Sequence, residues 1–102
     1  MRGRRELHFK WDPAKALSNE RKHGVAFMLA ASVFRDARIA VMFDEEHSIS
    51  DDRWIALGRA SSGWLLVIIH TWTELDPVNV RIRIISARRA TVAEELNYEN
   101  SL

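Results

Sequence analysis

The chain has 102 residues, which is enough for one domain with one modest core. It contains no cysteine, which excludes disulfide and thiolate chemistry and fits the reducing cytoplasm, where we expect the protein to act. The formal net charge of +1 does not by itself indicate nucleic acid as a partner, and no apolar run is long enough to cross a bilayer, so no membrane partner is expected.

The N-terminal end is basic, and residues 1–7 are interpreted as a flexible lead-in. This segment does not continue into the apolar core of a signal peptide, so secretion is not indicated. No linker, repeat or low-complexity tract follows it. We therefore expect a single domain over residues 8–102, beginning with a short strand at residues 9–11.

Two consecutive helices are predicted next. Asp12 can accept main-chain hydrogen bonds as an N-cap and Pro13 suits the first helical position, so a helix should start there. It should run to about His23, because Gly24 suits the left-handed conformation that ends many helices. Apolar residues recur at helical spacing over residues 27–34, which predicts the second helix.

The middle of the chain changes to strands, and the end returns to a helix. Four segments rich in Val, Ile, Leu and Trp are expected to pair as an antiparallel meander: residues 39–43, 53–59, 65–71 and 80–87. Thr91 and Glu94 match a capping box, which starts the last helix. The predicted fold is α+β, with a four- to five-stranded, mainly antiparallel sheet, two N-terminal helices and one C-terminal helix in the order β-α-α-β-β-β-β-α.

Arginines gather in the last predicted strand and just after it. Alternation places Arg81 and Arg83 on one face of the strand, and Arg88 and Arg89 follow directly before the last helix. Guanidinium groups and helix N-termini both bind phosphate oxygens, so the block is a candidate anion site. The alternative is a solvated sheet face whose arginines pair with the acids of residues 44–52. If these guanidinium groups lie on separate surfaces, or each pair with a carboxylate, the nuclease hypothesis fails and only the predicted architecture remains.

The four histidines are considered as proton carriers. His23 either complements the dipole of the first helix or transfers protons, since imidazole titrates near neutral pH. His70 ends a strand and is a core residue if its face is buried, and a site candidate otherwise. His8 and His47 are expected at the surface, and the acidic run beside His47 lacks the spacing of a calcium loop. No metal or other cofactor is expected, and no nucleophile elbow, P-loop or dinucleotide motif is present.

Motifs near both ends of the chain resemble the BrnT family. They are Trp11-Asp12-Pro13-Ala14-Lys15, Arg21-Lys22-His23-Gly24-Val25, and Arg83-Ile84-Ile85-Ser86-Ala87-Arg88-Arg89-Ala90-Thr91 followed by Glu94 and Tyr98. With the intervening segments, the resemblance covers nearly the whole chain. Only the basic lead-in departs from the family pattern.

The resemblance implies a type II toxin with a RelE-like fold that cleaves RNA without a metal and arrests translation. It also implies a BrnA-like DNA-binding antitoxin, so DNA is a partner only through the antitoxin. In RelE-like cleavage the ribose 2′-hydroxyl attacks the adjacent phosphate, which requires a base, cations and an acid. The candidate catalytic residues are Lys22, His23, Arg59, Arg83, Arg88, His70 and Tyr98. Arg81 and Arg89 are expected to bind neighbouring phosphates of the RNA.

The sequence is also compatible with two other functions. One is a non-catalytic module that uses the basic patch at Arg81–Arg89 to bind nucleic acid or an acidic partner. The other is a purely structural partner of another protein. Toxicity on expression, relieved by a neighbouring gene product, would distinguish an enzyme from both.

Overall fold

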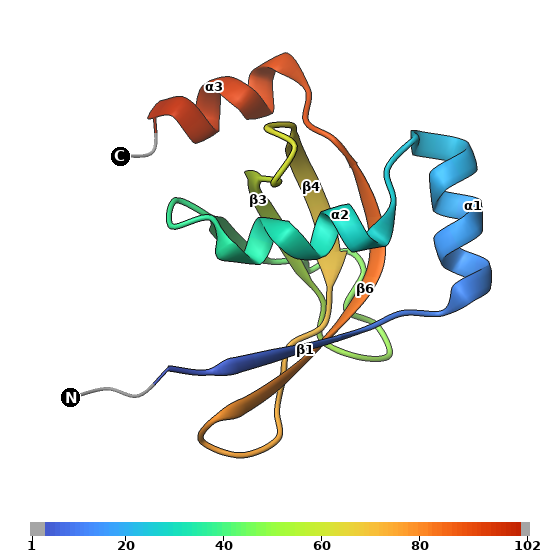
Figure 1. Cartoon of the computed structure of the whole chain (residues 1–102), viewed down its shortest axis with the longest axis vertical. Helices are drawn as coiled ribbons and strands as arrows, with labels where there is room; N and C mark the ends of the chain where they lie inside the picture. The colour runs from blue at the N-terminus through green and yellow to red at the C-terminus, as the bar shows by residue number, and fades with distance from the viewer. Residues whose placement is uncertain (1–3, 101–102) are drawn as a thin grey trace.

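The computed structural model describes residues 4–100 and shows an α+β fold (Figure 1). One sheet carries helix α2 across one face, α1 beside one edge and α3 at one end. The elements in chain order are β1 (Glu6–Lys10), α1 (Pro13–His23), α2 (Phe27–Ala31), η1 (Ser32–Arg35), β2 (Ala40–Phe43), β3 (Trp54–Arg59), β4 (Leu65–His70), β5 (Thr73–Glu74), β6 (Asn79–Arg89) and α3 (Val92–Asn100). The predicted order of elements is confirmed, with the two-residue strand β5 added in the loop after β4.

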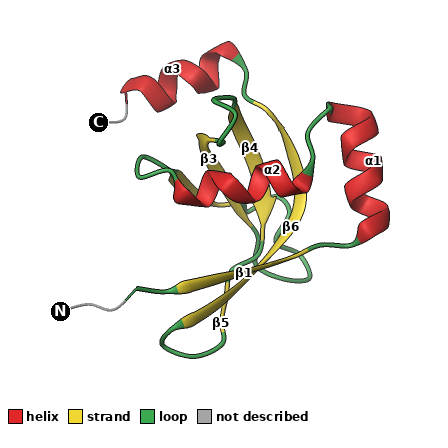
Figure 2. Cartoon of the chain, in the orientation of Figure 1, coloured by secondary structure: helices red, strands yellow, loops and turns green. Residues whose placement is uncertain are grey.

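The sheet has the strand order β1-β6-β4-β3-β2, and the short β5 pairs with β6 (Figure 2). All pairings are antiparallel except that of β1 with β6, which is parallel. Strand β1 begins at Glu6, so Glu6 and Leu7 belong to the sheet although the sequence placed them in the lead-in. Leu7 packs against the core, which explains the earlier start. The first residues of the predicted lead-in, 1–3, lie outside the described part of the chain.

Local signals in the sequence determine where α1 and α3 begin and end. The Asp12 carboxylate accepts a hydrogen bond from the main-chain N–H of Ala14 at 2.9 Å, and Gly24 adopts a left-handed φ of 70° at the end of α1. At the start of α3, the Glu94 N–H donates to Thr91 Oγ1 at 3.2 Å. The Thr91 N–H in turn donates to the Glu94 carboxylate at 2.8 Å, so the predicted capping box is formed.

The second helix, α2, is shorter than the apolar pattern over residues 27–34 predicted. Helix α2 ends at Ala31, and the chain continues as the 3₁₀ helix η1 to Arg35. The hydroxyl of Ser32 donates to the Leu29 carbonyl at 2.6 Å, and such a bond competes with regular helical pairing. The predicted apolar stripe still faces the sheet: Phe27 and Ala30 are buried, and Ala31 and Phe34 pack half-buried against the core. Val33, which was not part of the stripe, is also buried.

The core fills the space between α2, η1 and one face of the sheet. Its strand residues come from β3, β4 and β6, and the fully buried members are Ala56, Leu66, Ile68, Val80, Ile82, Ile84 and Ala87. These residues alternate with residues that point to the opposite face. The opposite face therefore stays free to form a site.

A β-bulge in β6 changes which side chains reach that opposite face. Adjacent residues of β4 pair with Ser86 and Ile84, so Ile85 is an extra residue in the ladder. Strict alternation would put Ser86 and Arg88 on the core face with Ile84. The bulge instead turns Ala87 into the core and directs Ser86 and Arg88 to the opposite face.

Candidate functional site

A groove of about 780 Å³ lies on the sheet face opposite the core. Its floor consists of two rows of paired residues that cross β2, β3, β4 and β6: Ala40, Leu57, Val67 and Arg88 in one, and Met42, Ile55, Ile69 and Ser86 in the other. Its walls are α3 and the loop between β2 and β3. The floor is mostly apolar, so the polar groups on the walls and Arg88 determine the chemistry.

Arg88 is held in place at this groove by Glu94 of α3. Two guanidinium nitrogens donate to the two carboxylate oxygens, both at 2.8 Å, and Nη1 also donates to the Arg89 carbonyl at 3.2 Å. The hydrogen bond from Arg88 lowers the pKa of Glu94 to about 2 and raises the pKa of Arg88. The pair is therefore fully charged at neutral pH, and the guanidinium has a defined orientation.

Tyr98 also lines the groove and is almost completely buried, with 3% of its surface exposed. Its hydroxyl donates to the Asp36 carboxylate at 2.6 Å, and the guanidinium carbons of Arg38 and Arg59 lie 5.0 and 5.2 Å from its ring centroid. Burial and the bond to Asp36 raise the pKa of Tyr98. Tyr98 thus stays protonated near neutral pH. Arg59 lies at the end of β3 and contacts Tyr98 through its guanidinium. It also forms an ion pair with Glu99 at 3.2 Å.

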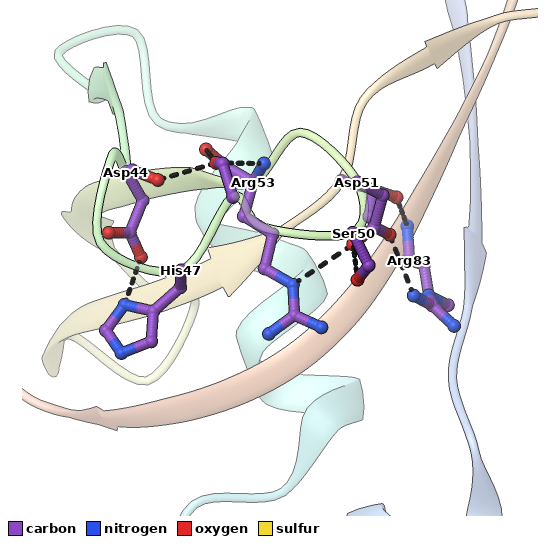
Figure 3. A network of polar contacts seen from close by, with 8 residues as sticks. Asp44, His47, Ser50, Asp51, Arg53 and Arg83 are labelled. Atoms are coloured by element: carbon purple, nitrogen blue, oxygen red, sulfur yellow. Dashed lines mark hydrogen bonds and ion pairs between the residues drawn. The ribbon is translucent and has the colours of Figure 1, made fainter.

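A histidine–aspartate pair lies on the loop wall of the groove. His47 Nδ1 lies 2.8 Å from the Asp44 carboxylate (Figure 3). Asp44 is 5% exposed, whereas 59% of the His47 side chain is exposed. The sequence interpretation assigned His47 no role. The signal that could have found it is the spacing of an aspartate and a histidine three residues apart across a turn.

Arg81 and Arg83 lie on a different surface. Together with Lys10, Asp51 and Trp72 they line a second cavity of about 690 Å³. Arg83 pairs with Asp51 at 3.2 Å, at the far end of the loop that carries the Asp44–His47 pair (Figure 3). The loop therefore borders both cavities.

The expectation that the arginines converge on one groove is wrong. Residues 83 and 88 are five positions apart in an extended strand, roughly 16 Å. Arg88 reaches the groove, Arg83 lines the second cavity, and Arg89 stacks on Trp64 at 4.3 Å from its ring centroid. Arg59, Arg83 and Arg88 each pair with a carboxylate. The nuclease hypothesis therefore loses the arginine cluster on which the sequence based it.

Lys22 and His23 are also not brought to the groove. They end α1, which lies beside the part of β6 beyond Arg83, where β1 no longer pairs, and Asn19 attaches α1 there. Lys22 is exposed and His23 is half-buried. Neither lines the groove or the second cavity.

His70 is a core residue, which corrects its assignment as a catalytic candidate. It is fully buried, and its ring meets Phe34 edge-on with centroids 4.9 Å apart. Nδ1 lies 2.8 Å from the Thr71 carbonyl, and Nε2 has no hydrogen-bond partner among the described residues. Burial lowers the pKa of His70, so the neutral ring is the form that the core accepts.

This burial predicts a pH dependence of stability. As pH falls below about 6.5, the unfolded chain binds a proton at His70 that the native core resists, so the free energy of unfolding should decrease until the lower native pKa is reached. Urea denaturation at pH 7.5 and pH 5.5 should show this loss, and His70→Leu should reduce it. The exposed His8 offers the control, since His8→Ala should retain the wild-type slope. An unchanged slope in His70→Leu would contradict the assignment.

The structure also bears on metal and membrane sites in residues 4–100. Within this range, no three His, Asp or Glu side chains converge in a way that could hold a metal ion. No helix in the same range is long and apolar enough to span a membrane.

Comparison with known proteins identifies the family. Residues 11–94 match the model of the family described as ribonuclease toxin, BrnT, of type II toxin-antitoxin system. The fold is similar to the crystal structure of the Brucella abortus ribonuclease toxin BrnT, with a TM-score of 0.61 and 23% identity over 84% of this chain and 99% of that chain. No curated protein sequence matches. The family match covers most of the chain, and on this basis the protein belongs to the BrnT family of ribonuclease toxins of type II toxin–antitoxin systems.

Proposed function

We propose that the protein cleaves RNA in the groove without a metal ion, arrests translation, and is neutralised by a BrnA-like DNA-binding antitoxin. The observation that carries the site is the fixed guanidinium of Arg88 on the groove floor. Its three hydrogen bonds leave further N–H donors of the guanidinium unused. Those donors can bind a non-bridging phosphate oxygen.

The proposed reaction is an internal transphosphorylation. The ribose 2′-oxygen attacks the adjacent phosphorus and the bond to the 5′-oxygen breaks, which leaves a 2′,3′-cyclic phosphate and a 5′-hydroxyl. Arg88 stabilises the negative charge that develops on the phosphoryl oxygens. Tyr98 and Arg59 support this end of the groove through their mutual contact and their bonds to Asp36 and Glu99.

Contacts outside the groove are proposed for the remaining cations. Arg81 and Arg83 on the second cavity and Arg89 at the end of β6 are positioned to bind flanking phosphates of a longer RNA. Each such contact makes binding more sensitive to salt, because it releases condensed counterions. Lys22, His23 and His70 are left out of the proposed site.

The edge strand β2 supports the proposal of a protein partner. It is the last strand in the sheet order, and its residues Val41, Met42 and Phe43 are 48%, 64% and 41% exposed. An exposed apolar edge strand is a surface on which another chain can pair. An antitoxin segment that covered β2 would also close one side of the groove.

The test combines purified protein with RNA in excess EDTA. We expect fragments that end in 2′,3′-cyclic phosphate and begin with a 5′-hydroxyl, and we expect expression to halt protein synthesis unless a BrnA-like antitoxin is co-expressed. Loss of cleavage on adding EDTA would contradict metal independence. A folded protein that cuts neither free nor ribosome-bound RNA would favour the alternative of a non-catalytic module that binds nucleic acid or a partner.

A further inference from the structure

We infer that His47, oriented by Asp44, is the catalytic base that removes the proton from the ribose 2′-hydroxyl. This inference rests on the proposed ribonuclease function and adds the proton-transfer group that Arg88 cannot supply. It is carried by the position of the pair on the groove wall and by the buried carboxylate that holds the ring.

The other histidines are placed elsewhere. His8 lies on β1, with Nε2 2.8 Å from the amide oxygen of Asn79. His23 ends α1 beside the edge of β6, and His70 is enclosed in the core. Of the four histidines, all within the described residues, His47 alone lines the groove. Tyr98 shares the groove, but its hydroxyl already donates to Asp36.

The loop fixes Asp44 so that it can orient the ring. The Asp44 N–H donates to the Arg53 carbonyl at 2.9 Å, and the Ser48 hydroxyl donates to the Asp44 carbonyl at 2.6 Å. The Arg53 N–H donates to Ser48 Oγ at 2.9 Å, which closes the turn. Because the carboxylate can only accept, Nδ1 carries the proton and Nε2 is left as a base. The exposed side chain of His47 gives RNA access to that nitrogen.

The step balances with water as the proton donor to the leaving group, because the hydroxide that forms takes up the proton that His47 releases. His47 Nε2 takes the 2′-hydroxyl proton as the bond between the 2′-oxygen and phosphorus forms, and water delivers a proton to the departing 5′-oxygen. The imidazolium then returns its proton to solvent. Four other ionisable groups line the same groove: Glu46 beside the pair, Arg88 on β6, and Glu94 and Tyr98 on α3. The Asp44 carboxylate stabilises the imidazolium that forms during the step.

The first test replaces the imidazole. His47→Ala should lower the rate of RNA cleavage by about 100-fold or more, the range typical of removing a general base, and added imidazole should restore part of the rate. The matched control His8→Ala should cleave at the wild-type rate. Thermal unfolding of each variant shows whether the fold is retained. His47→Ala with the wild-type rate would overturn the inference, whereas a wild-type chain without cleavage would refute the proposed function instead.

The second test addresses Asp44 as a positioning residue. Asp44→Asn keeps an oxygen that can accept from Nδ1–H but removes the negative charge that stabilises the imidazolium formed in the step, so kcat should fall while KM for a short RNA stays near the wild-type value. A purely structural role would lower stability and would raise KM along with any loss of kcat. A wild-type kcat in a folded Asp44→Asn protein would therefore overturn the role of Asp44.

Discussion

Arg88→Ala should lower the rate of RNA cleavage by about two to three orders of magnitude, the usual effect of removing one preorganised donor to a developing oxyanion. The guanidinium is held by two 2.8 Å hydrogen bonds to Glu94, so it needs little reorganisation when negative charge builds on the phosphate. Single-turnover cleavage of a short RNA measures the effect directly. Arg88→Lys should also be impaired, because an ammonium cannot reproduce the planar fork.

Two control variants test the loss of positive charge and the loss of orientation separately. Arg21 is exposed on α1, away from the groove, so Arg21→Ala matches the loss of charge and should cleave normally. Glu94→Gln keeps Arg88 but weakens its orientation, and it should lower the rate less than Arg88→Ala does. A wild-type cleavage rate in Arg88→Ala would remove the groove from the proposed mechanism.

The elements that the sequence predicted correctly are those with local signals. The N-cap at Asp12, the left-handed Gly24 and the capping box of Thr91 and Glu94 each act within one helical turn. Such signals need no knowledge of distant segments. The apolar stretches of β3 and β4 likewise indicated strands whatever their neighbours in the sheet.

The composition of the site could not be predicted, because it depends on how strands pair. One extra residue at Ile85 moves Arg88 to the groove face, and only the pairing of β4 with β6 reveals that bulge. The length of β6 then separates Arg83 from Arg88 although the two are close in sequence. The arginines of β6, although close in the sequence, therefore do not form one patch on the protein surface.

The burial of single polar residues could not be predicted from the sequence either. His47 was expected at the surface and is exposed, but the sequence did not indicate that Asp44 beside it is buried, where Ser48 and Arg53 close the turn. His70 could be placed on a strand but not inside the core, since that depends on Phe34 and η1 packing over it. Tertiary packing, rather than residue type, decided which histidine faces the groove.

Asn19→Ala should lower the free energy of unfolding by about 3 kcal/mol, the range expected when buried main-chain groups lose their partner. The Asn19 amide donates to the carbonyls of Val25 and Ala87 at 3.0 and 2.8 Å, and its oxygen accepts from the Ala87 N–H at 3.1 Å. It thereby takes the place of a neighbouring strand along β6, where β1 no longer pairs. Urea denaturation measures the loss.

Two further variants make this prediction specific. Ser18→Ala alters an exposed neighbour on the same helix and should change stability by less than about 0.5 kcal/mol. Asn19→Asp keeps an acceptor for the Ala87 N–H but turns carboxylate oxygen toward two carbonyls, so it should be as damaging as alanine at neutral pH. Since Ala87 precedes Arg88 beyond the bulge, loss of this attachment should also disturb the groove, and cleavage should fall in Asn19→Ala even where the protein is still folded. Full stability in Asn19→Ala would show that water or the rest of α1 can satisfy the edge of β6 without the amide.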